Sequence, residues 1–217
     1  MQHQSSATIF LADYYPVFRT EEGRSIDVLR EKAGLKHLSS IKDETLAAGK
    51  SAYYHSADSM ILIPIVGTII TAINETETEI ACGELLIVNA GIPLKVYNSY
   101  TDHLVNYLLL SINKSNRQEA GIAKKVFDLD SSKNELVEVF CKEEIKISLG
   151  KLEMRREAIY YSDRRQRSSF CFVVQGSFEI EGRLLHERDA LAVWNADSLD
   201  IESLGKESIL LLIDLAR

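Results

Sequence analysis

Two stretches of the chain follow one pattern: Pro64-Ile-Val-Gly67-Thr-Ile-Ile70 with Gly83-Glu-Leu-Leu-Ile-Val-Asn-Ala90, and Val173-Val-Gln-Gly176-Ser-Phe-Glu-Ile180 with Arg188-Asp-Ala-Leu-Ala-Val-Trp-Asn-Ala196. Each reads as a strand, a glycine turn, a second strand, an acidic turn and a strand that ends in Asn-Ala. The two registers agree to within about one residue, so the pattern indicates a duplicated structural unit.

The rest of the chain contains many short runs of β-branched and aromatic residues with turn residues between them. Glycine in Gln175-Gly176 and Glu181-Gly182 supplies the positive φ that tight hairpins need. Two polar stretches, residues 25–33 and 115–125, can each hold a short helix. This spacing predicts an all-β sandwich or barrel fold. The expected strands cover residues 60–66, 68–73, 85–88, 104–112, 170–174, 177–181, 190–194, 199–201 and 208–215.

Composition excludes several classes of protein. The 217 residues carry a formal net charge of −7, which repels a phosphate backbone, so we expect no nucleic-acid partner. The apolar run 60–66 is too short to span a bilayer, and the first six residues resemble no signal peptide. Cys82, Cys141 and Cys171 are scattered and odd in number, which fits the reduced cytoplasm. No nucleophile elbow, P-loop or dinucleotide motif is present.

A first motif starts at Gly49. His55 follows after five residues, Ala57 stands two positions later, Ile61 comes next in the spacing, and Gly67 closes it one residue early. This frame resembles the first metal-binding motif of cupin barrels, with Ala57 and Ile61 in place of a second His and a Glu. In such barrels, donors on neighbouring strands must point inward at one ion.

A second motif starts at Gly83. Gly91 and Asn98 keep the frame of the second cupin motif, while Leu94 stands where a His ligand belongs. The glycine and asparagine framework of both motifs is therefore retained although most donor positions are apolar.

Within the cupins, the chain resembles the pirin family, including its bacterial quercetinase-like members. The segments that carry the resemblance keep the family's order and are residues 10–13, 43–49, 58–60, 126–130, 134–136, 182–193 and 210–215. The resemblance implies two cupin (double-stranded β-helix, jelly-roll) barrels in one chain. We expect an N-terminal barrel over residues 1–113, a polar linker over 114–125 that is either helical or irregular, and a C-terminal barrel over 126–217.

Pirins typically hold iron with three His and one Glu, and the resemblance places these donors at His55, Ala57, Leu94 and Val96. His55 alone keeps a donor, and a lone imidazole cannot hold iron. We therefore expect a degenerate metal site, no metal cofactor and no catalytic residue. The alternative is that His55 is a relict ligand joined by a loop donor such as Asp102 or His103.

The apolar substitutions leave two interpretations open. The former site is either ordinary packed core or a dry pocket that admits an apolar or aromatic ligand. Tyr53 and Tyr54 can line the mouth of such a pocket, or they can be plain strand residues. The candidate pocket residues are Tyr53, Tyr54, His55, Ala57, Ile61, Leu94, Val96 and Asn98.

Five arginines in the second half form a candidate basic interaction face for an acidic protein partner, or else a solvated loop. They are Arg155, Arg156, Arg164, Arg165 and Arg167.

Together these features predict a non-enzymatic, cytoplasmic pirin-like bicupin that binds a small apolar molecule or another protein. The alternative is a metal-dependent dioxygenase of the quercetin 2,3-dioxygenase type acting on a flavonoid, which the resemblance alone would imply. That chemistry needs a metal to orient substrate and oxygen.

Overall fold

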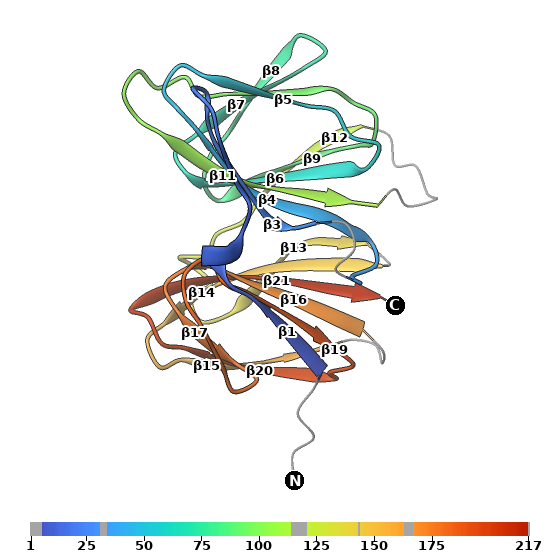
Figure 1. The fold of residues 1–217 in the computed structure, drawn as a ribbon, viewed down its shortest axis with the longest axis vertical. Coiled ribbons are helices and arrows are strands. Elements are labelled where there is room, and N and C mark those ends of the chain that lie inside the picture. The colour runs from blue at the N-terminus through green and yellow to red at the C-terminus, as the bar shows by residue number, and fades with distance from the viewer. Residues whose placement is uncertain (1–5, 31–33, 114–120, 143, 163–166, 217) are drawn as a thin grey trace. The chain divides into compact units, whose positions relative to one another are not determined.

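The computed structural model describes residues 6–30, 34–113, 121–142, 144–162 and 167–216. Apart from one 3-10 turn, the regular secondary structure of these residues consists of β-strands. The contacts divide the chain into two units, residues 16–126 (the N-terminal barrel) and residues 1–15 with 127–217 (the C-terminal barrel) (Figure 1). None of the described residues forms a helix long and apolar enough to cross a membrane.

The N-terminal barrel is built from a large and a small antiparallel sheet. Its strands are β2 (Val17–Arg19), β3 (Gly23–Leu29), β4 (Leu38–Leu46), β5 (Ser51–Tyr54), β6 (Ser59–Val66), β7 (Ile69–Ile73), β8 (Thr76–Ile80), β9 (Glu84–Val88), β10 (Leu94–Tyr97), β11 (Val105–Ile112) and β12 (Ile122–Val126). The large sheet has the order β12-β9-β6-β11-β4-β3-β2, and the small sheet has the order β5-β10-β7-β8.

The C-terminal barrel repeats this plan. Its elements are β1 (Ser6–Phe10), a 3-10 turn (Ala12–Tyr14), β13 (Leu136–Lys142), β14 (Ile145–Glu153), β15 (Glu157–Tyr161), β16 (Arg167–Gln175), β17 (Phe178–Ile180), β18 (Arg183–Leu185), β19 (Ala190–Trp194), β20 (Ser198–Ser203) and β21 (Glu207–Ala216). The large sheet has the order β1-β19-β16-β21-β14-β13, and the small sheet has the order β15-β20-β17-β18.

The strand orders of the two barrels match strand for strand, apart from the additional edge strand β2. Gly67 joins β6 to β7 and Gly176 joins β16 to β17, so the two glycine hairpins occupy equivalent places. The predicted duplication and all-β bicupin fold are confirmed, and each of the nine expected runs overlaps a strand.

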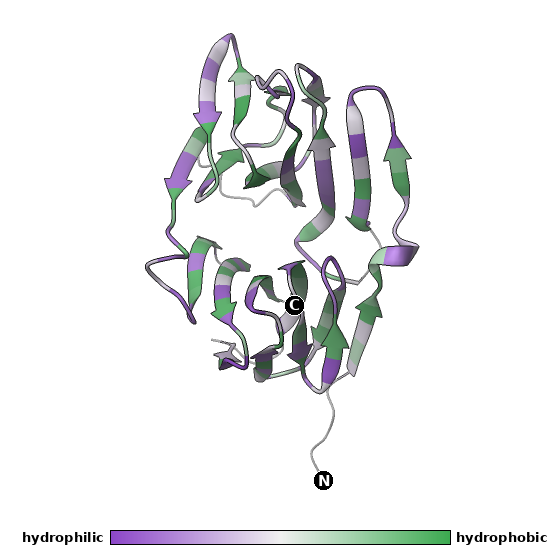
Figure 2. Ribbon diagram, turned by 90° about the vertical axis from the view of Figure 1, so that its left-hand side faces the viewer, coloured by the Kyte–Doolittle hydropathy of each residue, from purple (hydrophilic) through white to green (hydrophobic). Residues whose placement is uncertain are grey.

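Alternation of apolar and polar residues explains why each barrel has one core. In β7, the buried residues Ile69, Thr71 and Ile73 alternate with half-buried ones, as a strand with one core-facing side requires. Hydrophobic and hydrophilic bands alternate along several strands (Figure 2). The inward residues of each barrel form one buried apolar cluster, which contains Leu94, Val96 and Tyr107 in the N-terminal barrel and Cys171, Leu191 and Leu212 in the C-terminal barrel.

The structure departs from the expected boundaries in two places. Residues 1–15 belong to the C-terminal barrel, because β1 pairs with β19 over five residues. Within the expected linker, Ile122–Val126 is strand β12, which pairs with β9 of the N-terminal barrel, while residues 114–120 lie outside the described chain.

The expected helix over residues 25–33 is wrong for its first half. Residues 25–29 belong to β3, which pairs with β4. The side chains of Ser25 and Glu44, which are cross-strand partners, are hydrogen-bonded to each other, so tertiary pairing overrides the weak local helical pattern. Residues 31–33 lie outside the described chain.

Candidate functional site

Antiparallel pairing of β5 with β10 defines the place where pirin-type donors would converge. Leu94 lies opposite Tyr54, and Val96 lies opposite Ala52. Directly opposite residues share one face of a sheet. Leu94 and Val96 are fully buried in the core of the N-terminal barrel, and Ala52 and Tyr54 pack against that same core. The four inward positions of this strand pair therefore hold two aliphatic side chains, one methyl group and one phenol.

His55 and Ala57 do not belong to this set, so the donor positions expected from the sequence need correction. β5 ends at Tyr54, and both His55 and Ala57 are exposed beyond it. Side chains alternate between the faces of a strand, so a ligand frame that shares a face with Leu94 and Val96 must use Ala52 and Tyr54. His55 is exposed after the end of β5, whereas Leu94 and Val96 are fully buried.

A line of polar groups reaches the barrel interior from the large sheet. Ser25, Glu44 and Tyr107 are cross-strand partners in one row over β3, β4 and β11. Ser25 Oγ donates to Glu44 Oε1 at 2.9 Å, and the hydroxyl groups of Tyr54 and Tyr107 are 2.6 Å apart. Tyr54 is thus satisfied by a second phenol within the barrel.

Burial changes the acidity of these groups. It raises the pKa of the Tyr54 and Tyr107 hydroxyl groups above the usual tyrosine range, and the nearby charge of Glu44 acts in the same direction. Burial also raises the pKa of the Glu44 carboxyl, against the lowering effect of the Ser25 hydrogen bond. A tyrosine that ligates a metal does so as phenolate, so these shifts oppose ligation through Tyr54.

The residues at the four inward positions do not fit a bound iron or nickel ion. Such ions need three or more converging imidazole, carboxylate or thiolate donors. Ala52, Leu94 and Val96 supply none, and Tyr54 is engaged by Tyr107. Across the described residues, no group of three or more His, Cys, Asp or Glu side chains is placed to hold a metal.

The other candidate pocket residues lie elsewhere. Tyr53 is 74% exposed on the outer face of the small sheet, where Lys95 Nζ lies 5.7 Å from its ring centre. Ile61 is fully buried, but its neighbours Met60 and Leu62 are the β6 residues in the barrel core, so Ile61 faces the other side of the sheet.

Asn98 has a structural role. Its side-chain amide donates to the carbonyl oxygens of Leu46 at 3.1 Å and His103 at 2.8 Å, and its Oδ1 accepts from the Tyr100 backbone amide at 3.0 Å. These hydrogen bonds hold the loop between β10 and β11. They also satisfy the polar groups of the Asn98 side chain, which is completely buried.

The predicted basic face does not form one surface. Arg155 and Arg156 are exposed in the turn before β15, and Arg164 and Arg165 lie outside the described residues. Arg167 is buried inside the C-terminal barrel, because residues 167, 169 and 171 alternate onto the inner face of β16.

Arg167 belongs to a buried polar cluster that the sequence analysis missed. Its Nε lies 2.8 Å from Asp214 Oδ1, an ion pair in which the N–H is not aligned with the oxygen, and its Nη2 donates to the Asp214 carbonyl oxygen at 2.9 Å. Asp214 Oδ2 accepts from the hydroxyl groups of Tyr160 at 2.8 Å and Ser162 at 3.2 Å. The sequence feature that indicates this cluster is Asp214, a single acidic residue within the apolar run of β21.

Tyr160 and Tyr54 hold equivalent places. Tyr160 lies opposite Leu199 on β20, as Tyr54 lies opposite Leu94 on β10. The repeat extends along the strand, because Ala-Tyr-Tyr54-His-Ser matches Ala-Ile-Tyr160-Tyr-Ser at alternate residues. Each barrel thus turns one tyrosine inward from the edge strand of its small sheet.

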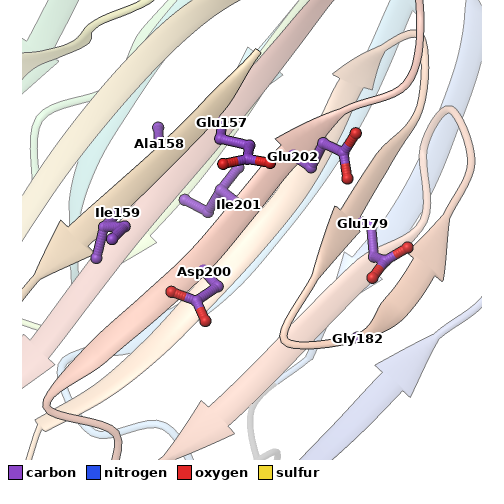
Figure 3. A pocket seen from close by; sticks show the side chains of 8 residues that line it. All are labelled: Glu157, Ala158, Ile159, Glu179, Gly182, Asp200, Ile201 and Glu202. Atoms are coloured by element: carbon purple, nitrogen blue, oxygen red, sulfur yellow. The ribbon is translucent and has the colours of Figure 1, made fainter. Parts of the chain in front are cut away.

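A hollow of about 330 Å³ lies against the small sheet of the C-terminal barrel (Figure 3). Carboxylates dominate its lining, and two like-charged pairs, Glu157 with Glu202 and Glu179 with Glu202, stand directly opposite each other across strands. Such pairs repel. The residues that line it are Glu157, Ala158, Ile159, Glu179, Gly182, Asp200, Ile201 and Glu202.

Comparison with known proteins identifies the type of barrel. Residues 131–215 match the quercetinase C-terminal cupin domain family. No curated protein sequence matches the chain.

Solved structures share the whole fold. YhhW from Escherichia coli has a TM-score of 0.85 at 18% identity, with 97% of each chain covered. The bacterial pirin YhhW in complex with nickel(II), also from Escherichia coli, has a TM-score of 0.83 at 17% identity and covers 97% of this chain and 99% of its own. Quercetin 2,3-dioxygenase from Acinetobacter baumannii has a TM-score of 0.76 at 11% identity, covering 96% of this chain and 85% of its own. The C-terminal barrel therefore resembles the quercetinase C-terminal cupin domain, and the chain as a whole shares the two-barrel fold of the bacterial pirin YhhW.

Proposed function

We propose that this protein is a pirin-like bicupin without a functional metal site, and that it works by binding a partner and not by oxygenase chemistry. One observation carries the proposal: Ala52, Tyr54, Leu94 and Val96 occupy the inward positions of the β5–β10 pair. These four side chains do not form a set of metal donors, and without a bound metal ion the site cannot polarise a substrate or oxygen in this way.

Packing at these positions favours a protein partner over a small apolar ligand. Leu94 is 1% and Val96 is 0% exposed, and both contact the buried core cluster around Tyr107. A small-molecule pocket needs space of roughly 300 Å³ or more. The hollow of about 330 Å³ described above lies instead on the outer surface of the other barrel, where four carboxylates line it.

The competing function is a metal-dependent dioxygenase, and the similarity to the Acinetobacter baumannii quercetin 2,3-dioxygenase supports it at the level of the fold. A fold hosts many activities, so the donor set decides between the two functions. The donor set at the inward positions supports the metal-free interpretation.

Metal content and quercetin turnover test the proposal directly. The protein is purified from cells grown with added iron and nickel, and elemental analysis is expected to find far less than one metal ion per chain. Oxygen-dependent loss of quercetin is expected to equal the rate without protein. One bound ion per chain, together with turnover that a chelator abolishes, would establish the dioxygenase instead.

A gain-of-binding experiment tests the position of the lost site. The variant Ala52→His, Tyr54→His, Leu94→His and Val96→Glu places four donors on one face, and is expected to bind one Ni(II) per chain. The control variant keeps His55 and carries Ala57→His, Leu94→His and Val96→Glu, and is expected to bind none. Circular dichroism checks that both variants fold. Stoichiometric Ni(II) binding by the control alone would show that the donor positions are those expected from the sequence.

A further inference from the structure

Strand β1 closes one side of the large sheet in the C-terminal barrel, and its other side pairs with no strand of the described chain. It runs antiparallel to β19, with Thr8 opposite Ala192 at its centre and no register shift. Ser6, Thr8 and Ile9 are exposed, while Ala7 packs against the barrel core. A regular edge strand of this kind presents unpaired N–H and C=O groups to solvent.

Most other sheet edges of the described protein carry charge. Proteins protect edge strands with charged side chains, proline, bulges or very short length. Of the eight edge strands, six contain at least one charged residue: β2, β8, β12, β13, β15 and β18. The seventh, β5, has four residues, and Lys95 lies beside its Tyr53.

β1 has none of these protections. Its sequence Ser-Ala-Thr-Ile-Phe is uncharged, and the first twelve residues of the chain contain no Asp, Glu, Lys or Arg. This is unusual in a barrel whose segments contain nineteen acidic and thirteen basic residues. Two copies of the protein repel one another through their net charge, but that repulsion is weakest where an uncharged strand meets another.

We propose that β1 is a self-association edge, and that two copies of this chain pair antiparallel through their β1 strands about a two-fold axis at Thr8. This register places Thr8 opposite Thr8, Ala7 opposite Ile9 and Ser6 opposite Phe10. Threonine pairs across strands stabilise a sheet, and the six-stranded sheet of each copy becomes half of a twelve-stranded sheet.

The chemistry of the strand favours a second copy over an unrelated peptide. An isologous pairing brings the same residues together twice, so a strand with any charge near its centre would repel itself. β1 meets this condition, with uncharged residues on both sides of Thr8. The Phe10 carbonyl oxygen already accepts a hydrogen bond from the Tyr15 hydroxyl at 3.1 Å, which leaves the centre of the strand as the place for new pairing.

Cysteine cross-linking tests both the association and its register. The full-length chain carries Cys82→Ser and Cys141→Ser, because these two thiols are exposed. In this background Thr8→Cys brings two thiols face to face, at a Cα separation of about 5 Å that suits a disulfide. Ser6→Cys is the matched control, since the two Ser6 positions lie roughly 13 Å apart along the paired strands. Mild oxidation is expected to give a covalent dimer of Thr8→Cys and at least tenfold less of Ser6→Cys.

Sedimentation measures the association without a cross-link. Thr8→Lys places like charges opposite each other and is expected to raise the dimer dissociation constant at least tenfold, while Thr8→Val preserves the uncharged strand and is expected to dimerise like the original protein. Thr8 is exposed, so neither change disturbs the core. A protein that is monomeric at every concentration up to the millimolar range, or that forms equal amounts of both cross-linked dimers, would overturn the proposal. A dimer that Thr8→Lys does not weaken would place the interface elsewhere.

Discussion

At the scale of single residues, each barrel has one tyrosine that projects from an edge strand into an apolar interior and buries its hydroxyl group there. A buried hydroxyl without a partner costs free energy, so each needs a hydrogen-bond partner. Tyr54 finds the hydroxyl of Tyr107, and Tyr160 finds the carboxylate of Asp214. The acceptor in the C-terminal barrel is charged and therefore needs Arg167 beside it.

The ion pair in the C-terminal barrel predicts a large loss of stability. Asp214→Asn leaves the Arg167 guanidinium buried without a counter-charge, which costs about 3–5 kcal/mol. Tyr160→Phe removes one hydrogen bond to a charged group and is expected to cost about 1.5–3 kcal/mol. Urea unfolding followed by the fluorescence of Trp194, the single tryptophan of the chain, reports on this barrel.

A surface ion pair serves as the control for that measurement. Asp130 is 75% exposed and contacts Lys151 at 2.8 Å, so Asp130→Asn is expected to cost less than about 1 kcal/mol. Equal losses in the free energy of unfolding for Asp130→Asn and Asp214→Asn would show that the buried ion pair contributes no more to stability than the exposed one.

Glu44 predicts a pH dependence in the N-terminal barrel. Its pKa is raised in the folded protein, mainly by burial, so the folded state binds its proton more tightly than the unfolded state. Stability from this group therefore rises as the pH falls through its folded pKa toward its unfolded value, and ionised Glu44 is destabilising at neutral pH. The other charged groups acting on it are Lys42, Asp27 and Asp43.

The expected result is that Glu44→Gln is more stable than the original protein at pH 7, and that the difference disappears toward pH 4. Glutamine keeps an acceptor for Ser25, so the hydrogen bond survives. Urea unfolding by circular dichroism at several pH values measures the difference, with Trp194 fluorescence as an internal control for the other barrel. A difference that grows as the pH falls would contradict the assignment.

At the scale of elements, the glycine hairpins show what local sequence determines. Gly176 and Gly182 both have positive φ, at +81° and +68°. A methyl group on Gly182 meets open space, whereas one on Gly176 collides with the side chain of Ser208, whose Cα would be 3.1 Å away. Gly182→Ala is therefore expected to cost about 1–2 kcal/mol for backbone strain alone. Gly176→Ala adds overpacking of about 1–3 kcal/mol, measured by Trp194 fluorescence.

The turns and apolar runs were predictable because their signals are local. Residues 190–194 follow a simple strand pattern, and β19 has those bounds. The strand conformation of residues 25–29 was not predictable, because β3 is polar and its pairing with β4 depends on partners distant in sequence. The same limit explains the error at His55: counting residues from Gly49 gives a spacing, but the pairing of β5 with β10 decides which face each side chain takes. Arg167 was misassigned because its charge suggested solvent, while strand alternation buries it.

At the scale of the whole molecule, each barrel follows one plan but is assembled from the chain differently. The N-terminal barrel uses one continuous segment, residues 16–126, whereas the C-terminal barrel takes its edge strand from the start of the chain. β1 and β12 hold equivalent edge positions, next to β19 and β9 respectively. A segment as short and weakly patterned as Ser6–Phe10 carries no local sign of which barrel it completes, so this crossing could not be predicted.

This arrangement predicts that deletion of residues 1–15 affects one barrel selectively. The deletion uncovers the hydrogen-bonding edge of β19 and removes two contacts of the barrel, the ring contact of Phe10 with Phe170 at 5.9 Å and the hydrogen bond from the Ala12 amide to Asp189 at 2.8 Å. Amide hydrogen exchange is expected to accelerate at least tenfold in residues 190–194, because their opening no longer has to break the β1 pairing. The equivalent strand β9 keeps β12 as its neighbour and is the internal control, with unchanged exchange. Equal acceleration in both strands would mean that the deletion destabilises the whole chain and that residues 1–15 do not belong to the C-terminal barrel alone.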